Sequence, residues 1–289
     1  MDTGPKRALA AAALSAAFVA GGCYDFGRAA FGDAGPDGGD TDTWEHDCPA
    51  GWAGDDCDVC VRYADAASPA AAPDGLRWGR AFRSVDAAIA AAFSGIGGAA
   101  DRCEVWVAGG TYHVYEVDAG DTIQLREGVD VYGGFAGDET ERDQRDPEVN
   151  ETVLDGGGGP AGDAPRVHHV VTGADDAVLD GFTVQRGDAD QAGGANPGDP
   201  KNWGGGMLNY SVSPTVRGCT FRDNRALFGG AVENMEGAAA RFESCRFEDN
   251  SAGAFGGAVD NDHSGAEFVD CVFSGNSGAL GGGAINGLY

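Results

Sequence analysis

The chain has 289 residues, including 50 glycines and eight cysteines, and a formal net charge of −27 at pH 7. A surface this acidic repels nucleic-acid phosphates and anionic lipid headgroups, so both are excluded as expected partners. It attracts cations weakly and diffusely; we therefore expect no cofactor other than weakly held calcium, and we assign no metal site.

Residues 1–22 have the order of a secretory signal peptide. Lys6 and Arg7 precede an apolar stretch, residues 8–19, and small residues lead from there to Cys23. The apolar stretch is too short for the roughly 20 residues that cross a bilayer. A basic end, a short apolar core and small residues together predict export.

The residues around Cys23 indicate a lipid anchor. Residues 20–22 (Ala-Gly-Gly) resemble a lipobox, with Ala where the family prefers Leu, which implies that Cys23 becomes the lipidated first residue of the mature protein. Tyr24, by the usual sorting pattern of lipoproteins, implies the outer membrane. The alternative is a plain secretory signal that leaves Cys23 as an ordinary thiol in a secreted protein. Residues 23–47, rich in Gly, Asp and Ala, are predicted to be a flexible tether.

Residues 48–75 form a short cysteine-rich segment and linker. The stretch from Cys48 to Cys57 resembles the last loop of an EGF-like module, although only three cysteines lie here and such a module needs six. In an oxidising compartment we expect a Cys48–Cys57 disulfide, which leaves Cys60 and Cys103 as a candidate pair. A zinc site at Cys57 and Cys60 is the alternative, but no second pair completes it.

A helix is expected within residues 76–100. From Trp78 to Phe93, apolar residues recur at helical spacing, with Phe82, Val85 and Ile89 on one face. This amphipathic helix would cover the open apolar end of the repeats that follow, as solenoids require. A helix that binds a partner is the alternative.

Strands are expected to begin downstream of this helix. The sequences VWVAGGTY at residues 105–112 and GVDVYGGF at residues 128–135 are predicted to be the first strands. Two similar pentapeptides, TVLDG at residues 152–156 and AVLDG at residues 177–181, are 25 residues apart, which predicts equivalent positions in successive repeats. Residues 188–203 are predicted to be a polar loop that protrudes from one repeat.

The clearest signal is a repeat in the C-terminal third of the chain. Three hexapeptides begin 26 residues apart, with Cys first, Phe third and Asn sixth: Cys219, Phe221 and Asn224; Cys245, Phe247 and Asn250; Cys271, Phe273 and Asn276. Between them stand Gly-Gly-Ala-Val or Gly-Gly-Ala-Ile tetrapeptides, whose second glycines are Gly230, Gly257 and Gly283, followed by Asn234, Asn261 and Asn286. Residues 181–184 align with residues 218–221, which places Phe182 at the later cysteine position.

A fixed period of this length indicates stacked units that cannot bury their apolar faces alone. Cys219 and Phe221 share one face of a strand, where the cysteines would pack as small apolar residues. Asn residues at the same position of each unit can form amide ladders. The sequence therefore predicts an all-β fold, a right-handed parallel β-helix solenoid over residues 101–289 with an N-terminal capping helix. The chain stops at Tyr289 within a repeat, which leaves either a truncated product or an uncapped last coil.

These motifs also carry a resemblance. The paired FxxN and GGA[IV] motifs resemble the repeats of the chlamydial polymorphic outer-membrane proteins, over roughly residues 204–289. The upstream sequences VYGGFAG, TVLDG and VLDGFTV resemble pectin-lyase-like β-helix surface proteins. The resemblance implies a β-helix at the bacterial surface, and an adhesin-like role.

Catalytic residues are not evident. Asp175 and Asp176, with His169 shortly before them, come nearest to the clustered carboxylates and base of β-helix polysaccharide lyases and hydrolases. The two aspartates are more simply residues of a solvated turn, and the adjacent His168 and His169 are expected on opposite faces of a strand. Exposed aromatic residues, Trp203 and Tyr210, could instead form a carbohydrate-stacking surface.

We therefore expect an exported, monomeric, non-catalytic lipoprotein of the outer membrane or cell surface. Its β-helix would be an adhesion or ligand-binding module for a glycan or a surface protein. Two alternatives stay open: a polysaccharide lyase or glycoside hydrolase on the same fold, and a purely structural protein of the cell envelope. The fold hosts both enzymes and binders, so fold alone does not choose between them.

Overall fold

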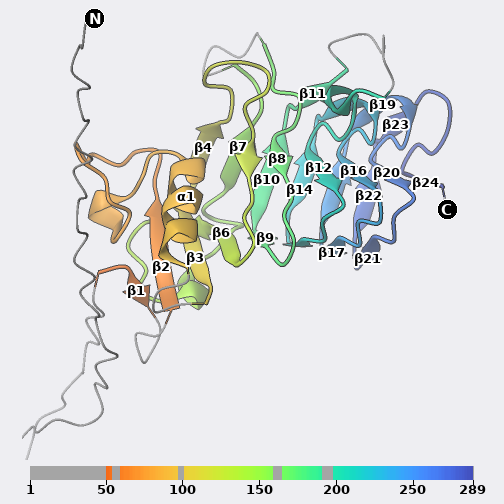
Figure 1. The fold of residues 1–289 in the computed structure, drawn as a ribbon. Helices are drawn as coiled ribbons and strands as arrows, with labels where there is room; N and C mark the ends of the chain where they lie inside the picture. The colour runs from red at the N-terminus through yellow and green to blue at the C-terminus, as the bar shows by residue number, and fades with distance from the viewer. Residues whose placement is uncertain (1–49, 54–58, 97–100, 159–164, 191–197, 289) are drawn as a thin grey trace, which may run out of the picture. The chain divides into compact units, whose positions relative to one another are not determined.

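The computed structural model describes residues 50–53, 59–96, 101–158, 165–190 and 198–288. Within these ranges the fold is all-β: short strands form four sheets, accompanied by one α-helix and three short 3₁₀ turns (Figure 1). Cys23, Cys48 and Cys57 lie outside the described residues, so lipidation of the first and a disulfide between the other two stay predictions.

Sheet I begins near the N-terminal end of the described residues. Its strands are, in spatial order, β1 (Trp52–Ala53), β2 (Val59–Ala64), β3 (Cys103–Ala108), β6 (Val129–Phe135), β9 (Val178–Asp180), β13 (Thr215–Arg217), β17 (Arg241–Glu243) and β21 (Glu267–Val269). The β1–β2 pair is antiparallel, and the other neighbours are parallel.

Sheets II, III and IV contain only parallel neighbours among the described strands. Sheet II holds β4 (Gly110–His113), β7 (Thr152–Asp155), β10 (Phe182–Gln185), β14 (Thr220–Arg222), β18 (Arg246–Glu248) and β22 (Val272–Ser274). Sheet III holds β11 (Asp188–Ala189), β15 (Arg225–Phe228), β19 (Ser251–Phe255) and β23 (Ser277–Gly278). Sheet IV holds β5 (Ile123–Gln124), β8 (Val171–Thr172), β12 (Met207–Tyr210), β16 (Val232–Met235), β20 (Val259–Asp262) and β24 (Ile285–Leu288).

From β9 onward the chain visits the four sheets in the same order in each repeat, whereas the described strands β3 to β8 visit only sheets I, II and IV. Strands β13 to β16 lie in sheets I to IV, and β17 to β20 repeat that order one layer further along (Figure 1). Thr215 pairs with Arg241, and Arg241 pairs with Glu267, so 26 residues separate each in-register pair. The predicted period is confirmed as the spacing between hydrogen-bonded neighbours.

The repeated phenylalanines and cysteines face the interior. Phe221, Phe247 and Phe273 stack with ring centroids 5.3 and 4.7 Å apart, along the column that the sequence predicted. Cys219 and Cys245 are fully buried free thiols, and burial raises the pKa of Cys219 to about 12. The register of β10 against β14 brings Phe182 level with Cys219, as predicted. The cysteines therefore serve as core residues.

One predicted asparagine ladder is confirmed in full. The Nδ2 of Asn224 donates to the Oδ1 of Asn250 at 3.1 Å, and the Nδ2 of Asn250 donates to the Oδ1 of Asn276 at 3.0 Å. These amides also donate to backbone carbonyls of the preceding repeat, such as Phe221 O at 2.9 Å. Buried amide groups need such partners, so the ladder joins the repeats as well as filling space.

The second predicted ladder ends one repeat earlier than expected. Asn234 donates to Asn261 at 2.9 Å, but Asn286 pairs with Asp260 and donates to its Oδ1 at 2.8 Å. Asn286 directly follows the tetrapeptide, whereas Asn234 follows one residue later. A shift of one residue moves a side chain to the opposite face of a strand, and the prediction for Asn286 was wrong for that reason.

Backbone crowding between sheets III and IV explains the Gly-Gly-Ala motif. A Cβ on Gly230 would lie 2.3 Å from the carbonyl oxygen of Gly257 and 2.5 Å from that of Ser251. Gly229 has a φ of +57°, a conformation that glycine adopts readily. The pair thus allows a sharp turn from β15 into β16 and sets the angle between two strands that border the pocket described below.

The helix is shorter than the apolar spacing predicted. Helix α1 spans Val85–Gly95 and begins where the Ser84 hydroxyl accepts a hydrogen bond from the backbone amide of Ala87. Phe82 lies before the helix, in a backbone bridge to Ala64, and Phe93 is 47% exposed. The 3₁₀ turns are η1 (Trp78–Arg80), η2 (Arg142–Gln144) and η3 (Pro200–Asn202).

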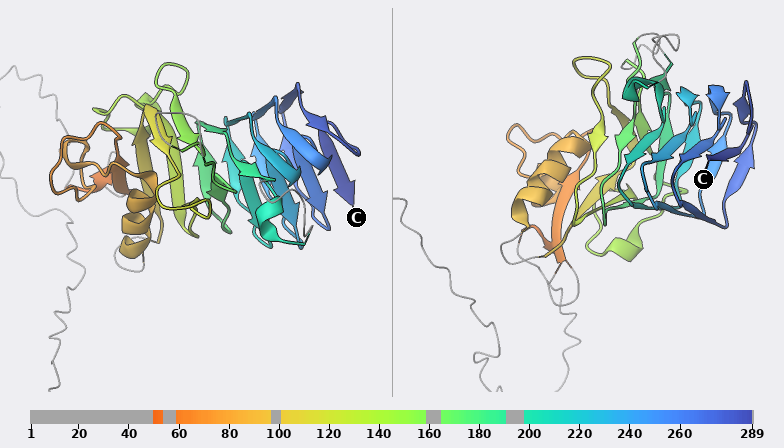
Figure 2. Two further views of the ribbon diagram at one scale, coloured as in Figure 1. Left: turned by 90° about the horizontal axis from the view of Figure 1, so that it is seen from above. Right: turned by 45° about the vertical axis from the view of Figure 1, so that its right-hand side comes forward.

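Helix α1 packs against β2, β3, β5 and β6, at the end of the unit opposite β24 (Figure 2). It buries Val85, Ala88, Ile89 and Ala92 there. Among the described residues, no helix is both long and apolar enough to cross a membrane.

The cysteine-rich segment contributes directly to sheet I. Strand β2 pairs in parallel with β3, and Cys60 forms a disulfide with Cys103 across this pair. The candidate pair of the sequence analysis is therefore confirmed. Strands β3 and β6 were predicted as the first strands, but β1 and β2 precede them in the sheet.

The two similar pentapeptides occupy different sheets. Leu154 in β7 pairs with Val184 in sheet II, whereas Leu179 in β9 pairs with Val131 and Val216 in sheet I. The prediction of equivalent positions was wrong. A Val-Leu-Asp-Gly sequence suits any short strand that buries one leucine before a turn, so it does not distinguish one sheet from another.

Candidate functional site

A pocket of about 510 Å³ opens beside sheets III and IV. It lies against β16, β20 and β24 and the ends of β15 and β19. Figure 1 shows β16, β20 and β24 side by side towards the C-terminal end of the described chain. Its lining consists of Gly198, Trp203, Phe228, Glu233, Met235, Phe255, Asp260, Asp262, Asn286 and Gly287. The pocket therefore combines an aromatic wall with an acidic one.

The aromatic wall is a row of three side chains at one register position. Parallel backbone bridges join Trp203 to Phe228 and Phe255 to Gly281, and the amide of Gly229 donates to the carbonyl of Phe255. The Phe228 and Phe255 rings stack with centroids 6.2 Å apart, and Phe255 is 37% exposed. Rings left accessible in a pocket provide an apolar surface for a ligand.

The acidic wall follows from strand alternation in sheet IV. Val232 and Asn234 of β16 point inward, so Glu233 and Met235 point to the other face and line the pocket. Glu233 pairs in register with Asp260, and Asp260 with Asn286, which places two carboxyl groups and one amide in a column.

Glu233 is an unusual member of this column. Its side chain is 2% exposed, and its Oε2 has no hydrogen-bond partner. Burial, reinforced by the charges of Asp260 and Asp262, raises the pKa of Glu233 well above its ordinary value. A buried carboxyl group without a donor costs stability, and such groups concentrate at functional sites.

The other two carboxyl groups have partners. Asp260 accepts from Asn286 at 2.8 Å, and burial raises its pKa, with the charge of Asp262 contributing. Asp262 Oδ1 lies 2.6 Å from Nδ1 of the exposed His263. Glu233 is therefore the carboxyl group of this wall that a ligand would satisfy.

We expect Glu233→Gln to raise the free energy of unfolding by about 1–3 kcal/mol at pH 8, because it removes a buried charge that lacks a donor. The pKa of Glu233 is raised in the folded state. This cost is therefore absent below the pKa of Glu233 in the unfolded chain, about 4.3, and grows as the pH rises from there to the folded-state pKa. Urea denaturation at pH 5 and pH 8 measures the difference. A variant less stable than the wild type at pH 8 would show that the carboxylate is stabilised in the fold.

The structure does not assemble the residues that the sequence offered as a catalytic group. Asp175 Oδ1 accepts from the amide of Ser213 at 2.8 Å, and Asp176 forms an ion pair with Arg102. His169 Nδ1 lies 3.1 Å from the carbonyl oxygen of Gly204, and burial lowers its pKa to about 4. Each group is bonded to a different neighbour, which fits the structural roles that the sequence favoured for them.

The prediction for the adjacent His168 and His169 was also wrong. His168 and His169 precede β8 and belong to no strand, so the expectation of opposite strand faces was wrong. Of the two predicted stacking residues, Trp203 lines the pocket, whereas Tyr210, at the end of β12 and 53% exposed, does not.

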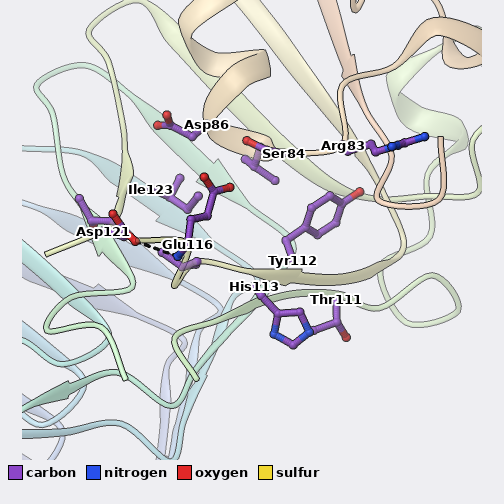
Figure 3. Close-up of a pocket in the computed structure, with 12 residues that line it drawn as sticks. Arg83, Ser84, Asp86, Thr111, Tyr112, His113, Glu116, Asp121 and Ile123 are labelled. Carbon is purple, nitrogen blue, oxygen red and sulfur yellow. Dashed lines mark hydrogen bonds between the residues drawn. The ribbon is translucent and has the colours of Figure 1, made fainter. Parts of the chain in front are cut away.

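A second pocket, of about 300 Å³, lies where the start of α1 faces β4 and β5 (Figure 3). Several of its polar groups already have structural partners, although the buried Nδ1 of His113 has none among the described residues. Asp121 accepts from three backbone amides, one of them that of Glu116, and Tyr112 donates to the carbonyl of Ala108 at 3.0 Å. Ser84 caps α1. These bonded side chains therefore stabilise the local fold and are less available to a ligand.

Metal binding finds no support in the described ranges. No group of three or more His, Cys, Asp or Glu side chains there is arranged to hold an ion. Calcium, which prefers several oxygen ligands around one point, stays a prediction of weak and diffuse binding.

Sequence reasoning missed the pocket, although one signal was present. The residue that follows each Gly-Gly-Ala-Val or Gly-Gly-Ala-Ile tetrapeptide is polar and can accept hydrogen bonds: Glu233, Asp260 and Asn286. An aromatic residue directly precedes two of the tetrapeptides, Phe228 and Phe255. Comparison of the chain with protein-family models, curated proteins and solved structures found no match, so a functional proposal depends on the geometry of this pocket.

Proposed function

We propose that this chain is a non-catalytic, surface-exposed lipoprotein whose right-handed parallel β-helix binds a glycan in the pocket formed by the aromatic and acidic walls. The observation that carries the proposal is that Trp203, Phe228 and Phe255 line the same pocket as Glu233, Asp260 and Asn286. Sugars present apolar ring faces and hydroxyl groups, which match an aromatic wall and an acceptor wall respectively.

Several features support the β-helix. From β9 onward each repeat contributes one strand to each of the four sheets, and in-register neighbours from β13 to β21 in sheet I are 26 residues apart. Connections between parallel strands of one sheet are right-handed in almost all proteins, which favours that hand here. Helix α1 packs on the first strands and fits the role of a cap, and the resemblance to pectin-lyase-like surface proteins agrees with this architecture.

The location at the cell surface is supported by the sequence alone. The signal-like N-terminus, the lipobox-like residues before Cys23 and the acidic composition favour an exported, lipid-anchored protein. Protease accessibility on intact cells would check it, and a protein that stays protected until the outer membrane is broken would contradict exposure.

The pocket favours binding over catalysis. A catalytic pair of carboxyl groups usually has pKa values pushed apart, so that one is the acid and the other is ionised. Here the pKa values of both Glu233 and Asp260 are raised, chiefly by burial. Among the described residues that line the pocket, none is a Lys, Arg or His that could act as a base. A glycoside hydrolase is nevertheless the second candidate, because Glu233 is a buried acid next to another carboxyl group.

A glycan array probed with the full chain would test the proposal, with both retention and release of reducing ends recorded. We expect retention without release, and Phe255→Ala should weaken retention about tenfold because it removes the most accessible ring of the wall. Tyr210→Ala is the matched control, since Tyr210 is an exposed aromatic outside the pocket.

Three results would contradict the proposal. Release of reducing ends would favour the hydrolase. Equal effects of the two alanine variants would place the glycan elsewhere on the surface. Silence of the array would favour the purely structural role in the envelope.

A further inference from the structure

We infer that the pocket selects glycans that carry a free ammonium group, such as de-N-acetylated amino sugars, and that Glu233 and Asp260 receive this group. The inference rests on the proposed glycan-binding function and adds the chemical class of the ligand. Its starting point is Glu233, which is almost completely buried, lines the pocket and has an Oε2 without a partner.

The acidic wall lacks a compensating cation. Glu233 and Asp260 are direct neighbours on adjacent parallel strands, and like charges at such positions repel each other. None of the lining residues that the structure describes is Lys, Arg or His, and Asp260 is bonded to the neutral amide of Asn286. A ligand ammonium would supply both the missing hydrogen-bond donor and the missing positive charge.

Other glycans satisfy this wall less well. A uronic acid would place a third negative charge beside two carboxyl groups, which costs several kcal/mol in such an interface. A neutral sugar could donate a hydroxyl to Glu233, but it would leave the repulsion between Glu233 and Asp260 uncompensated. The net charge of −27 adds to the preference, because it steers cations towards the surface and anions away from it.

The aromatic wall fits the same ligand. Trp203, Phe228 and Phe255 line the same pocket as the carboxyl groups, and the faces of aromatic rings attract cations as well as apolar sugar faces. An amino sugar placed between the walls can use both. Its ring packs on the aromatic row, and its ammonium group points to the acidic column.

Calorimetric titration of the full chain with two hexasaccharides tests the inference: one of glucosamine with free amines, the other of N-acetylglucosamine. We expect the free amine form to bind at least roughly tenfold more tightly, since it forms charge-assisted hydrogen bonds that the acetylated form cannot. Glu233→Gln should remove most of this preference. Glu267→Gln, a change of equal charge at an exposed position in sheet I, should retain the preference.

The possible outcomes separate the inference from the proposed function. If the acetylated hexamer binds as tightly as the free amine form, the inference fails and the glycan-binding function stands. If neither binds, both fail. If both glutamate variants lose the preference equally, diffuse surface charge causes it and the inference fails. A lysine-rich peptide is the third probe. Tight binding of the peptide, with no binding of the free amine hexamer, would show that the ammonium group belongs to a protein ligand and would overturn the inference of a glycan ligand.

Discussion

Replacement of Phe247 by alanine is expected to lower the free energy of unfolding by about 3–5 kcal/mol, the usual cost of removing a fully buried phenylalanine. Phe247 has no exposed surface, and its ring stacks between Phe221 and Phe273. It also meets Phe242 and Phe268 edge-on, with centroids 5.8 and 6.1 Å away. Its loss leaves a cavity in the middle of the column that the neighbouring rings cannot close, because the backbone ladders hold their positions.

Urea denaturation of the Phe247→Ala protein measures this loss, and Phe255→Ala provides the comparison. Both residues recur in the repeats, but Phe255 belongs to the pocket wall and is 37% exposed. We therefore expect Phe255→Ala to cost less than about 1 kcal/mol and to act on ligand binding instead. A similar loss for both variants would mean that the aromatic wall is part of the core.

Replacement of Asp155 by asparagine is expected to cost about 3–5 kcal/mol at neutral pH, because it removes the negative charge from a largely buried ion pair. The Asp155 side chain is 3% exposed and accepts from Arg186 Nε at 2.7 Å and Nη2 at 2.5 Å. Gln185 Nε2 and the amide of Gly157 also donate to it, each at 2.9 Å.

The pH dependence of this pair is opposite in sign to that of Glu233. Burial alone would raise the pKa of Asp155, but the hydrogen bonds from Arg186, Gly157 and Gln185 outweigh it and hold the pKa below its ordinary value. The stabilisation is therefore fully present above the unfolded-state pKa of about 3.9 and is lost as the pH falls through the folded-state value.

Denaturation of the Asp155→Asn protein from pH 2 to pH 7 checks both points. The difference from the wild type should shrink as the pH falls. Glu267→Gln, which removes the exposed partner of Arg241, should cause no measurable loss at any of these pH values. A loss for Asp155→Asn that does not depend on pH would show that geometry, and not charge, is responsible.

The sequence by itself determined the period and the faces of the strands. Residues 26 positions apart occupy neighbouring strands, and alternation assigns Cys219 and Phe221 to the same, interior face without any knowledge of the sheets. These features are local or periodic, so the pattern of side chains is enough to predict them. The Cys60–Cys103 pair could also be proposed, because the other candidate partners were few.

Only the tertiary structure decided the positions that depend on one residue of register. Asn286 lies on the pocket face and not in the inner ladder, and Leu154 and Leu179 lie in different sheets despite their similar surroundings. The pocket itself joins Phe255, at the end of a strand in sheet III, to Asp260, in a strand of sheet IV. The turn between these sheets sets the angle at which their side chains meet. That angle depends on how the backbone packs against the neighbouring repeats, and the sequence of a single repeat does not contain this information.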